Sequence, residues 1–156
     1  MQTSENGINL IKEMEGFRSK AYQCEAHKWT IGYGHTRGVK AKDVVTEQQA
    51  LDILIEDIRT FEPAVMDLLR RSPEVYIDGR KIDRQFQFDA LVSFTFNCGT
   101  SAIRRTGLAR AIEDGLPEHM VRAQFERWVY VDGKPLPGLV HRRLLESDLY
   151  FGIVHL

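Results

Sequence analysis

The segment from residue 83 to residue 99 constrains the fold more than any other part of the chain. Asp83 is a good helix N-cap and Gly99 is a good helix end, so one helix is expected between them. Its apolar residues fall on nearly every side of that helix: Phe86, Phe88, Leu91, Val92, Phe94 and Phe96. A helix that is apolar all round has to be covered by other elements. The sequence therefore predicts a helical body packed around this segment.

Further helices are expected on both sides of it. Ile8, Ile11 and Glu15 share one face of a first helix, which Gly16 ends. Thr46 begins a capping box before an amphipathic helix over about 51–61, which Pro63 kinks or ends. Helical patterns continue at about 64–72, 106–114, 117–128 and 139–150. The segment 75–82 surrounds an Asp-Gly turn and is either a small hairpin or a plain loop.

Residues 21–35 have a different pattern, typical of short strands. In the run 29–35 the odd-numbered positions hold bulky residues, and the even-numbered positions hold Thr30, Gly32 and Gly34. Alternate positions of a strand lie on opposite faces, so one face is bulky and the other is nearly bare. The predicted fold class is α+β, with residues 1–156 as a single domain. A small antiparallel sheet lobe (about 17–45) and a mostly helical lobe (about 64–156 with the first helix) are joined by the long helix. The cleft between the lobes is the expected binding site.

Composition excludes several classes of protein. The chain has 156 residues, of which 43% are hydrophobic, enough for a sizeable core without metal or disulfides. Lys and Arg number 21 against 22 Asp and Glu, which disfavours nucleic-acid binding. Cys24 and Cys98 form no C-x-x-C pattern and are expected to be free thiols. The first 16 residues resemble neither a signal peptide nor a membrane span, so synthesis in the cytoplasm without an export signal is expected.

Glu15 is the most informative polar residue. It lies on the apolar stripe of the first helix, at the end where unpaired carbonyls carry partial negative charge. Desolvation and that charge both disfavour the carboxylate, so they are expected to raise its pKa and keep a proton available for general acid catalysis. The alternative is a structural Glu paired with Arg18 or Lys20.

Several motifs carry a resemblance to a known family. They are Glu15-Gly16-Phe17-Arg18, Ala21-Tyr22, Trp29-Thr30-Ile31-Gly32-Tyr33-Gly34-His35-Thr36, Phe88-Asp89-Ala90-Leu91, Phe96-Asn97-Cys98-Gly99, Trp128 and Pro137-Gly138-Leu139-Val140-His141-Arg142-Arg143. Over about residues 5–150 the chain resembles the phage-type lysozymes of glycoside hydrolase family 24. That family's pattern is Glu, eight residues, Asp, five residues, Thr. Glu15, Cys24 and Thr30 match its spacing, with Cys in place of Asp.

The resemblance implies hydrolysis of the β-1,4 bond between N-acetylmuramic acid and N-acetylglucosamine in bacterial peptidoglycan, without cofactor or metal. Glu15 protonates the leaving oxygen, and Thr30 helps to orient the attacking water. A thiol with a pKa of about 8.5 offers less electrostatic help than a carboxylate. A positive neighbour such as His27 or Lys28 is expected to lower the pKa of Cys24 and keep it a working second catalytic group. The alternative is a weakened or inactive site.

Other residues are expected near the site. By the resemblance, His35 reaches Asp57 on the long helix and ties the sheet lobe to it. Gly32 and Gly34 either clear space for the sugar chain or are plain strand glycines. The family uses the positions of Thr36 and Phe96 for substrate contact, although Phe96 alone also reads as core.

The remaining motif residues leave alternatives open. Asn97 either caps its helix or meets the glycan. Trp128 is expected to pack against the core rather than to bind sugar. Arg142 and Arg143 either meet acidic peptide stems or lie at a solvated helix start.

Together these expectations describe a phage or prophage endolysin. Its partner is peptidoglycan; no nucleic acid and no stable protein partner are expected, and the chain is expected to be a monomer. It would accumulate in the host bacterial cytoplasm and reach the wall after membrane permeabilisation, which usually requires a holin. The alternatives are a peptidoglycan-binding module without catalysis and a lytic transglycosylase.

Overall fold

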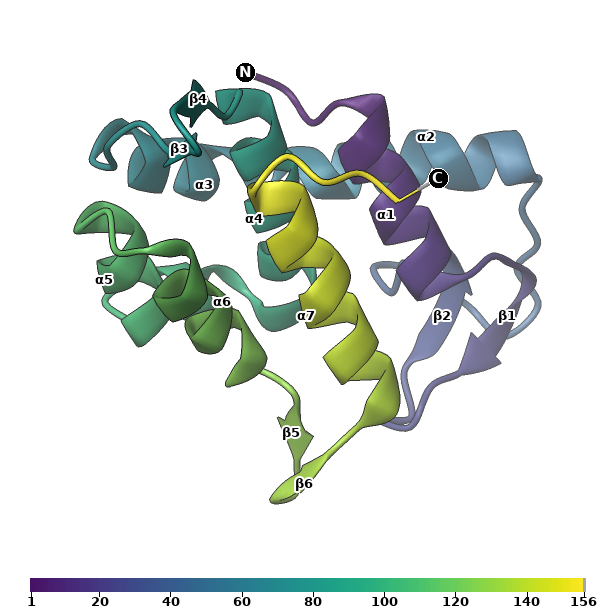
Figure 1. Ribbon diagram of the computed structural model, residues 1–156. Helices are drawn as coiled ribbons and strands as arrows, with labels where there is room; N and C mark the ends of the chain where they lie inside the picture. Colours follow the sequence, from purple (N-terminus) through teal and green to yellow (C-terminus); the bar gives the residue numbers. More distant parts are fainter. Residues whose placement is uncertain (156) are drawn as a thin grey trace.

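The computed structural model describes residues 1–155 and has the predicted α+β architecture (Figure 1). Its helices are α1 (Glu5–Glu15), α2 (Glu47–Arg59), α3 (Glu62–Arg70), α4 (Arg84–Cys98), the 3-10 helix η1 (Thr100–Ile103), α5 (Gly107–Glu113), α6 (Glu118–Glu126) and α7 (Pro137–Tyr150). Three antiparallel ribbons pair β1 (Arg18–Gln23) with β2 (Trp29–Gly32), β3 (Tyr76–Ile77) with β4 (Arg80–Lys81), and β5 (Tyr130–Val131) with β6 (Lys134–Pro135). Within residues 1–155, no helix combines the length and the apolar character that crossing a membrane requires.

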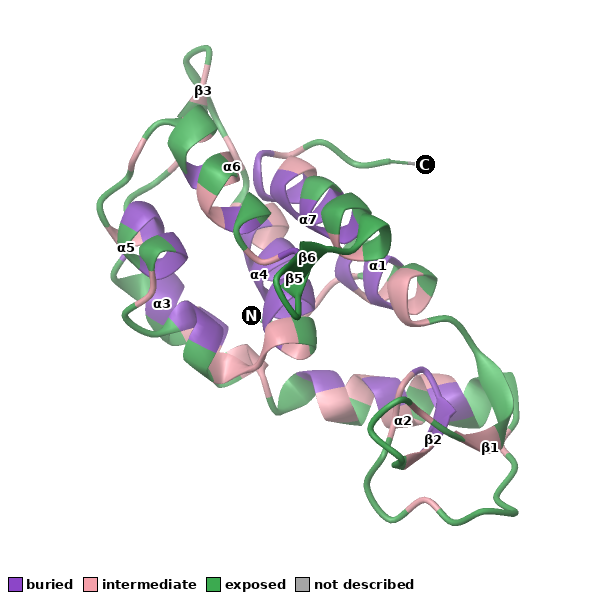
Figure 2. Cartoon of the chain, turned by 90° about the horizontal axis from the view of Figure 1, so that it is seen from below, coloured by how far each residue is buried: buried purple, intermediate pink, exposed green. Residues whose placement is uncertain are grey.

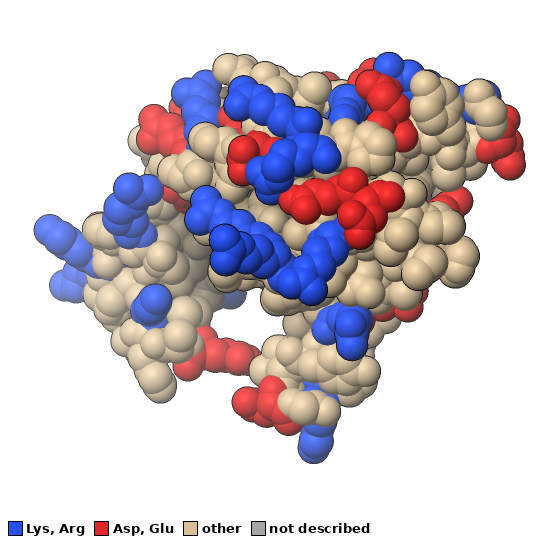
Figure 3. Space-filling model, turned by 90° about the vertical axis from the view of Figure 1, so that its left-hand side faces the viewer, with Lys and Arg blue, Asp and Glu red and all other residues tan. Residues whose placement is uncertain are grey.

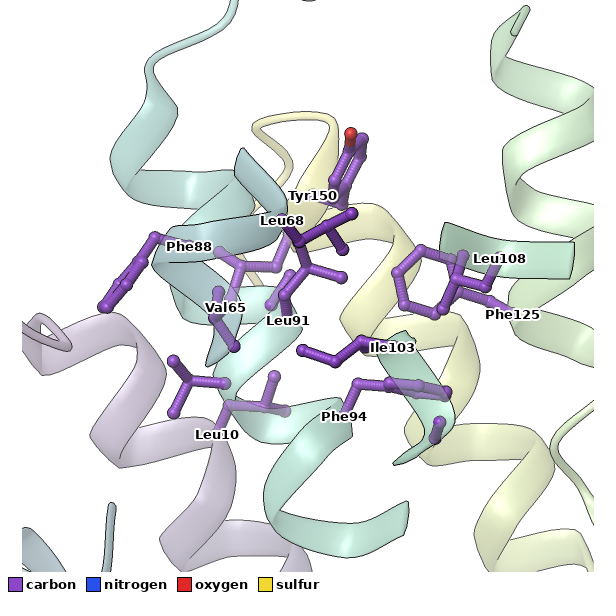
Figure 4. Close-up of a cluster of buried hydrophobic side chains, with 14 of the residues drawn as sticks. Leu10, Val65, Leu68, Phe88, Leu91, Phe94, Ile103, Leu108, Phe125 and Tyr150 are labelled. Atoms are coloured by element: carbon purple, nitrogen blue, oxygen red, sulfur yellow. The ribbon is translucent and has the colours of Figure 1, made fainter. Parts of the chain in front are cut away.

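Helix α4 is the centre of the core, as the sequence predicts. Every residue from Gln87 to Thr95 is buried, and α1, α3 and α7 pack around the helix (Figure 2). Figure 4 shows Phe88, Leu91 and Phe94 of α4 among side chains of these neighbours. An apolar surface on all sides of α4 thus brings α1 and α7, which are far apart in the sequence, to the same helix.

Most helix ends follow the local signals. The capping box at Thr46 is formed, and Gly16 ends α1 with a φ of +69° that favours glycine. Helix α7 begins at Pro137 instead of about 139, because proline suits the first helical turn. The segment around Asp78-Gly79 is a hairpin, which decides between the two alternatives.

The β5–β6 hairpin and η1 are two elements that were not predicted from the sequence. The hairpin turn is Asp132-Gly133, and both residues have positive φ, at +50° and +77°. Asp-Gly is a strong signal for such a two-residue turn, so the hairpin was detectable in the sequence.

The sheet lobe lies against α2, apart from the α4–α7 helices (Figures 1 and 2). Strands β1 and β2 pair Tyr22 with Thr30, and the loop after β2 returns along the outer edge of β1. That return is fixed by backbone hydrogen bonds from Ala21 N to Asp43 O at 3.0 Å and from Val45 N to Ser19 O at 2.9 Å. The fold therefore presents two lobes with α2 leading from one to the other.

Candidate active site

Glu15 is held at the end of α1 by an arginine of α7. Its Oε1 accepts a hydrogen bond from Arg142 Nη1 at 2.8 Å, and its side chain is 22% exposed. The expected alternative partners were wrong: the guanidinium of Arg18 stacks over Tyr22 at 4.3 Å, and Lys20 is exposed on β1. Glu15 is therefore a half-buried, paired carboxyl group rather than an isolated one.

Gly34 approaches the other oxygen of Glu15. A Cβ at Gly34 would lie 3.0 Å from Glu15 Oε2, and the φ of +78° also favours glycine. Gly32 has a similar backbone but a different neighbour, since its Cβ would lie 3.1 Å from that of Ala50 on α2. The structure thus gives both glycines a packing role: Gly34 leaves room for the carboxyl group, and Gly32 lets β2 lie close to α2.

Arg142 belongs to a buried charge network. It is 4% exposed and donates to Glu146 Oε1 at 3.0 Å and to the Ser93 carbonyl at 3.1 Å. Burial lowers the pKa of Arg142, but the carboxylates of Glu146 and Glu15 outweigh burial and raise it. The expectation that Arg142 lies at a solvated helix start or meets peptide stems was wrong, because the side chain points into the protein.

Arg143 is also buried, at 1% exposure, and the same expectation was wrong for it. It donates to the Trp128 carbonyl at 2.9 Å, to Glu146 Oε2 and to Asn97 Oδ1. The Asn97 side chain therefore accepts a hydrogen bond from Arg143. This contact differs from both expected roles of Asn97, which were capping its helix and contacting the glycan. Trp128 packs edge-on against Phe94 with ring centres 5.5 Å apart, so its predicted packing role is confirmed.

Cys24 and Thr30 come together at the end of the β1–β2 hairpin. The turn is closed by hydrogen bonds from Cys24 N to Lys28 O at 3.0 Å and from His27 N to Cys24 O at 2.8 Å. Thr30 is 4% exposed and donates from its hydroxyl to Lys28 O at 3.0 Å. Cys24 is partly exposed.

The backbone amide of Lys28 and the Thr30 hydroxyl lower the pKa of the Cys24 thiol, against a smaller opposing effect of burial. The lowered pKa was predicted, but its expected cause, the charge of His27 or Lys28, was wrong. Burial instead raises the pKa of Cys98, and both cysteines are free thiols. Cys24 is therefore the cysteine that more readily forms a thiolate.

A groove of about 300 Å³ runs beside Gly34 and is the counterpart of the predicted cleft. Its lining consists of Gly34, His35, Thr36, Arg37, Asp57, Thr60, Phe61 and Phe96. The predicted contact between His35 and Asp57 is present, with Nδ1 and Oδ2 2.7 Å apart. Phe96 packs edge-on against Phe61 with ring centres 5.6 Å apart, so it faces both the core and the groove.

The structure thus joins the expected residues in two groups. In the first group, Glu15 contacts Gly34, which lines the groove. In the second group, the side chains of Cys24 and Thr30 lie together in the β1–β2 hairpin. Reciprocal backbone hydrogen bonds between Ile31 and His35 connect the hairpin to the groove. Cys24 and Thr30 are not among the residues that line the groove. A carboxyl group, a thiol with a lowered pKa and a hydroxyl are nevertheless the groups that acid–base or nucleophilic chemistry requires.

Arg142 was not predicted as the partner of Glu15. A signal was present: Arg142 shares a helix face with Leu145 and Leu149, and Glu146 follows four residues later. An arginine on an apolar face with a carboxylate in reach is expected to point inward and be paired.

Comparisons with known proteins show the family of the chain. The family model "Phage lysozyme" matches residues 12–146. An endolysin of Acyrthosiphon pisum secondary endosymbiont phage 1 is 40% identical, over 96% of this chain and 98% of the relative. An endolysin of Bacillus phage PZA is also 40% identical, but the chain spans only 55% of its length. Among solved structures, the muramidase domain of SpmX from Asticaccaulis excentricus has a TM-score of 0.81 and 32% identity, over 96% of this chain and 97% of that one.

Proposed function

Because this chain belongs to the phage lysozyme family, we propose that its groove holds a peptidoglycan strand with the scissile bond beside Glu15. The chain is a glycoside hydrolase of the lysozyme type, with a muramidase-type lytic function in host lysis. The bond cut is the β-1,4 linkage between N-acetylmuramic acid and N-acetylglucosamine. The observation that carries the proposal is the fixed orientation of the Glu15 carboxyl group between Arg142 and Gly34.

Arg142 determines which oxygen of Glu15 carries the catalytic proton. A guanidinium group donates hydrogen bonds and accepts none, so a proton on Oε1 would face a donor. A proton that Glu15 carries for the reaction is therefore placed on Oε2, on the side of Gly34 and the groove. In the proposed reaction it passes to the leaving glycosidic oxygen as the bond to the anomeric carbon breaks.

Cys24 and Thr30 are proposed to serve the opposite face of the sugar. The lowered pKa makes the thiolate of Cys24 available to stabilise an oxocarbenium-like transition state or to attack the anomeric carbon. The Thr30 hydroxyl lies within hydrogen-bond reach of the Cys24 sulfur as well as of the Lys28 carbonyl, so it can donate to the thiolate or, by rotation, to a water molecule. In the first role, water attacks the anomeric carbon as the glycosidic bond breaks, which gives inversion. In the second role, the sulfur bonds to the anomeric carbon as the glycosidic bond breaks, and water, deprotonated by Glu15, then cleaves the carbon–sulfur bond, which gives retention.

We further propose that residues 1–156 form one domain that acts as a monomer without a stable protein partner. In this proposal the enzyme reaches the wall from the host cytoplasm after membrane permeabilisation, which usually requires a holin. Sedimentation of the purified chain and lysis timing with and without a co-expressed holin test these two statements.

The test of the catalytic proposal is digestion of purified sacculi followed by mass spectrometry of the products. The parent is expected to release fragments with reducing muramic ends, and Glu15→Gln is expected to release none. Cys24→Ala and Thr30→Val are expected to release them more slowly than the parent. Loss of a general acid typically costs about 100- to 10,000-fold in rate. Products with 1,6-anhydro ends would identify a transglycosylase, and uncut sacculi would identify a binding module. Full lysis by Glu15→Gln would remove Glu15 from the mechanism.

A further inference from the structure

The charges of the chain are divided unevenly between the sheet lobe and the rest. Residues 17–45 hold six Lys and Arg against two acidic residues, whereas the other residues hold fifteen against twenty. The sheet lobe therefore has a formal charge of +4 in a protein whose net charge is −1. Its cationic residues are Arg18, Lys20, Lys28, Arg37, Lys40 and Lys42.

These six side chains are exposed and largely without carboxylate partners. Only Arg37 lies within 4.0 Å of a carboxylate among the described residues, at 3.7 Å from Asp57. The lobe's own Asp43 accepts a hydrogen bond from the Lys40 backbone at 2.8 Å. Helix α2 carries further acidic residues, but Glu47 and Glu56 form no ion pair with the lobe in residues 1–155.

One face of the helical lobe arranges its charges differently, although Arg104, Arg105 and Arg110 of that lobe are exposed and form no ion pair in residues 1–155. On the face formed by α3 and α5, Lys and Arg are interspersed with Asp and Glu (Figure 3). There Arg71 is paired with Asp67 and Glu113, at 2.5 Å and 2.9 Å. Cations that are already paired attract an external anion less than the free cations of the sheet lobe do.

Two of the six cations belong to segments of the proposed active site. Arg37 lines the groove, and the backbone of Lys28 contacts both Cys24 and Thr30. The loop that carries Lys40 and Lys42 pairs with β1 beside Lys20, through the Lys20–Val44 bridge. A polymer lying in the groove therefore contacts Arg37, and its flexible side branches can extend to the lobe that carries the other five cations.

We propose that the exposed cations of the sheet lobe bind the carboxylates of the peptide stems attached to the glycan strand. This inference rests on the proposed function, because a strand held in the groove carries its stems, attached to the muramic residues, past the lobe. Arg142 and Arg143 are buried and cannot meet the stems. Attraction between exposed charges reaches about 10 Å at 0.1 M salt, so flexible stems need no fixed geometry to be bound.

The test compares two triple variants that lose the same charge. The first is Lys20→Gln, Lys40→Gln and Lys42→Gln. The control is Arg104→Gln, Arg105→Gln and Arg110→Gln, exposed residues after η1 and on α5 that form no ion pair in residues 1–155. On native sacculi at low salt, the sheet-lobe variant is expected to raise KM about tenfold with kcat unchanged, and the control less than twofold.

Chemical treatment of the sacculi identifies the anion. Amidation of the stem carboxylates is expected to raise the KM of the parent to that of the sheet-lobe variant, and to abolish the difference between them. About 0.5 M salt should have the same equalising effect, because exposed charges are screened. Equal effects of both triple variants would overturn the inference, as would a difference that survives amidation.

Two further results separate this inference from its alternatives. Removal of wall phosphate polymers with hydrofluoric acid should leave the difference between parent and variant intact; its disappearance would assign the surface to phosphate and overturn the stem assignment. A parent that releases no reducing muramic ends from native sacculi would instead refute the proposed function, whereas an active parent matched by the sheet-lobe variant refutes only the stem contact.

Discussion

The buried network around Glu146 gives the sharpest test of how the site is supported. Glu146 is fully buried and accepts hydrogen bonds from Ser93 Oγ at 2.8 Å, from Arg142 Nε at 3.0 Å and from Arg143 Nη1. The substitution Glu146→Gln keeps the shape of the side chain but removes the charge. Its NH₂ group then has to face a guanidinium in either orientation, and both groups are donors.

The expected cost follows from the two buried arginines. Without Glu146, Arg142 keeps Glu15 as a carboxylate partner, whereas Arg143 has no other carboxylate within 4.0 Å among the described residues. Removing one partner of a buried ion pair typically costs about 3–5 kcal/mol. At about 2–4 °C for each kcal/mol in a chain of this size, the melting temperature should fall by about 10 °C.

The chain offers a matched control at the surface. Glu118 pairs with Arg122 at 2.8 Å with the same four-residue spacing, but the Glu118 side chain is 37% exposed. Glu118→Gln should cost below about 0.5 kcal/mol. Urea unfolding of the parent and both variants at pH 7, monitored by circular dichroism, measures the loss in free energy of unfolding for each variant. Equal losses, or a loss below about 1 kcal/mol for Glu146→Gln, would refute the reasoning that burial makes this network strong.

Two further predictions concern pH. In a Cys98→Ala background, the rate at which Cys24 reacts with a thiol reagent should rise with pH, with a midpoint below the ordinary pKa of cysteine. Thr30→Val should raise that midpoint, because the Thr30 hydroxyl lowers the pKa of Cys24, second only to the Lys28 backbone. An unchanged midpoint would remove the hydroxyl from the explanation. Burial raises the pKa of Asp89, so its stabilising protonation is complete below the unfolded pKa of about 3.9 and is lost as pH rises through the folded pKa. The free energy of unfolding of Asp89→Asn should therefore increase relative to the parent from about pH 4 upward, and a difference that does not change with pH in urea titrations would contradict this.

Local signals were sufficient to predict most of the fold. The capping box at Thr46, the glycine after α1 and the all-round apolar pattern of α4 each act over one helix, and each is found where the sequence places it. The contact between His35 and Asp57 was also predicted, although from the resemblance rather than from spacing.

Contacts between distant segments were not predictable in the same way. Arg142 lies 127 positions from Glu15, and nothing in either local pattern fixes their distance. The roles of Gly32 and Gly34 likewise depend on α2 and α1, which only tertiary packing brings to the hairpin. The direction of the Cys24 pKa shift was right and its cause was wrong, because backbone amides of a tight turn leave no trace in the residue types.

The two halves of the proposed site are positioned by different parts of the protein. Glu15 depends on the buried network of α4 and α7 through Arg142, whereas Cys24 depends on the turn of the β1–β2 hairpin. Substitutions at separate sites that share no partner act nearly independently. Glu146→Gln should therefore leave the thiol titration of Cys24 unchanged below the melting temperature, and Thr30→Val should leave the urea midpoint set by the network nearly unchanged. Coupled changes in both measurements would mean that the two lobes position the site as one rigid unit.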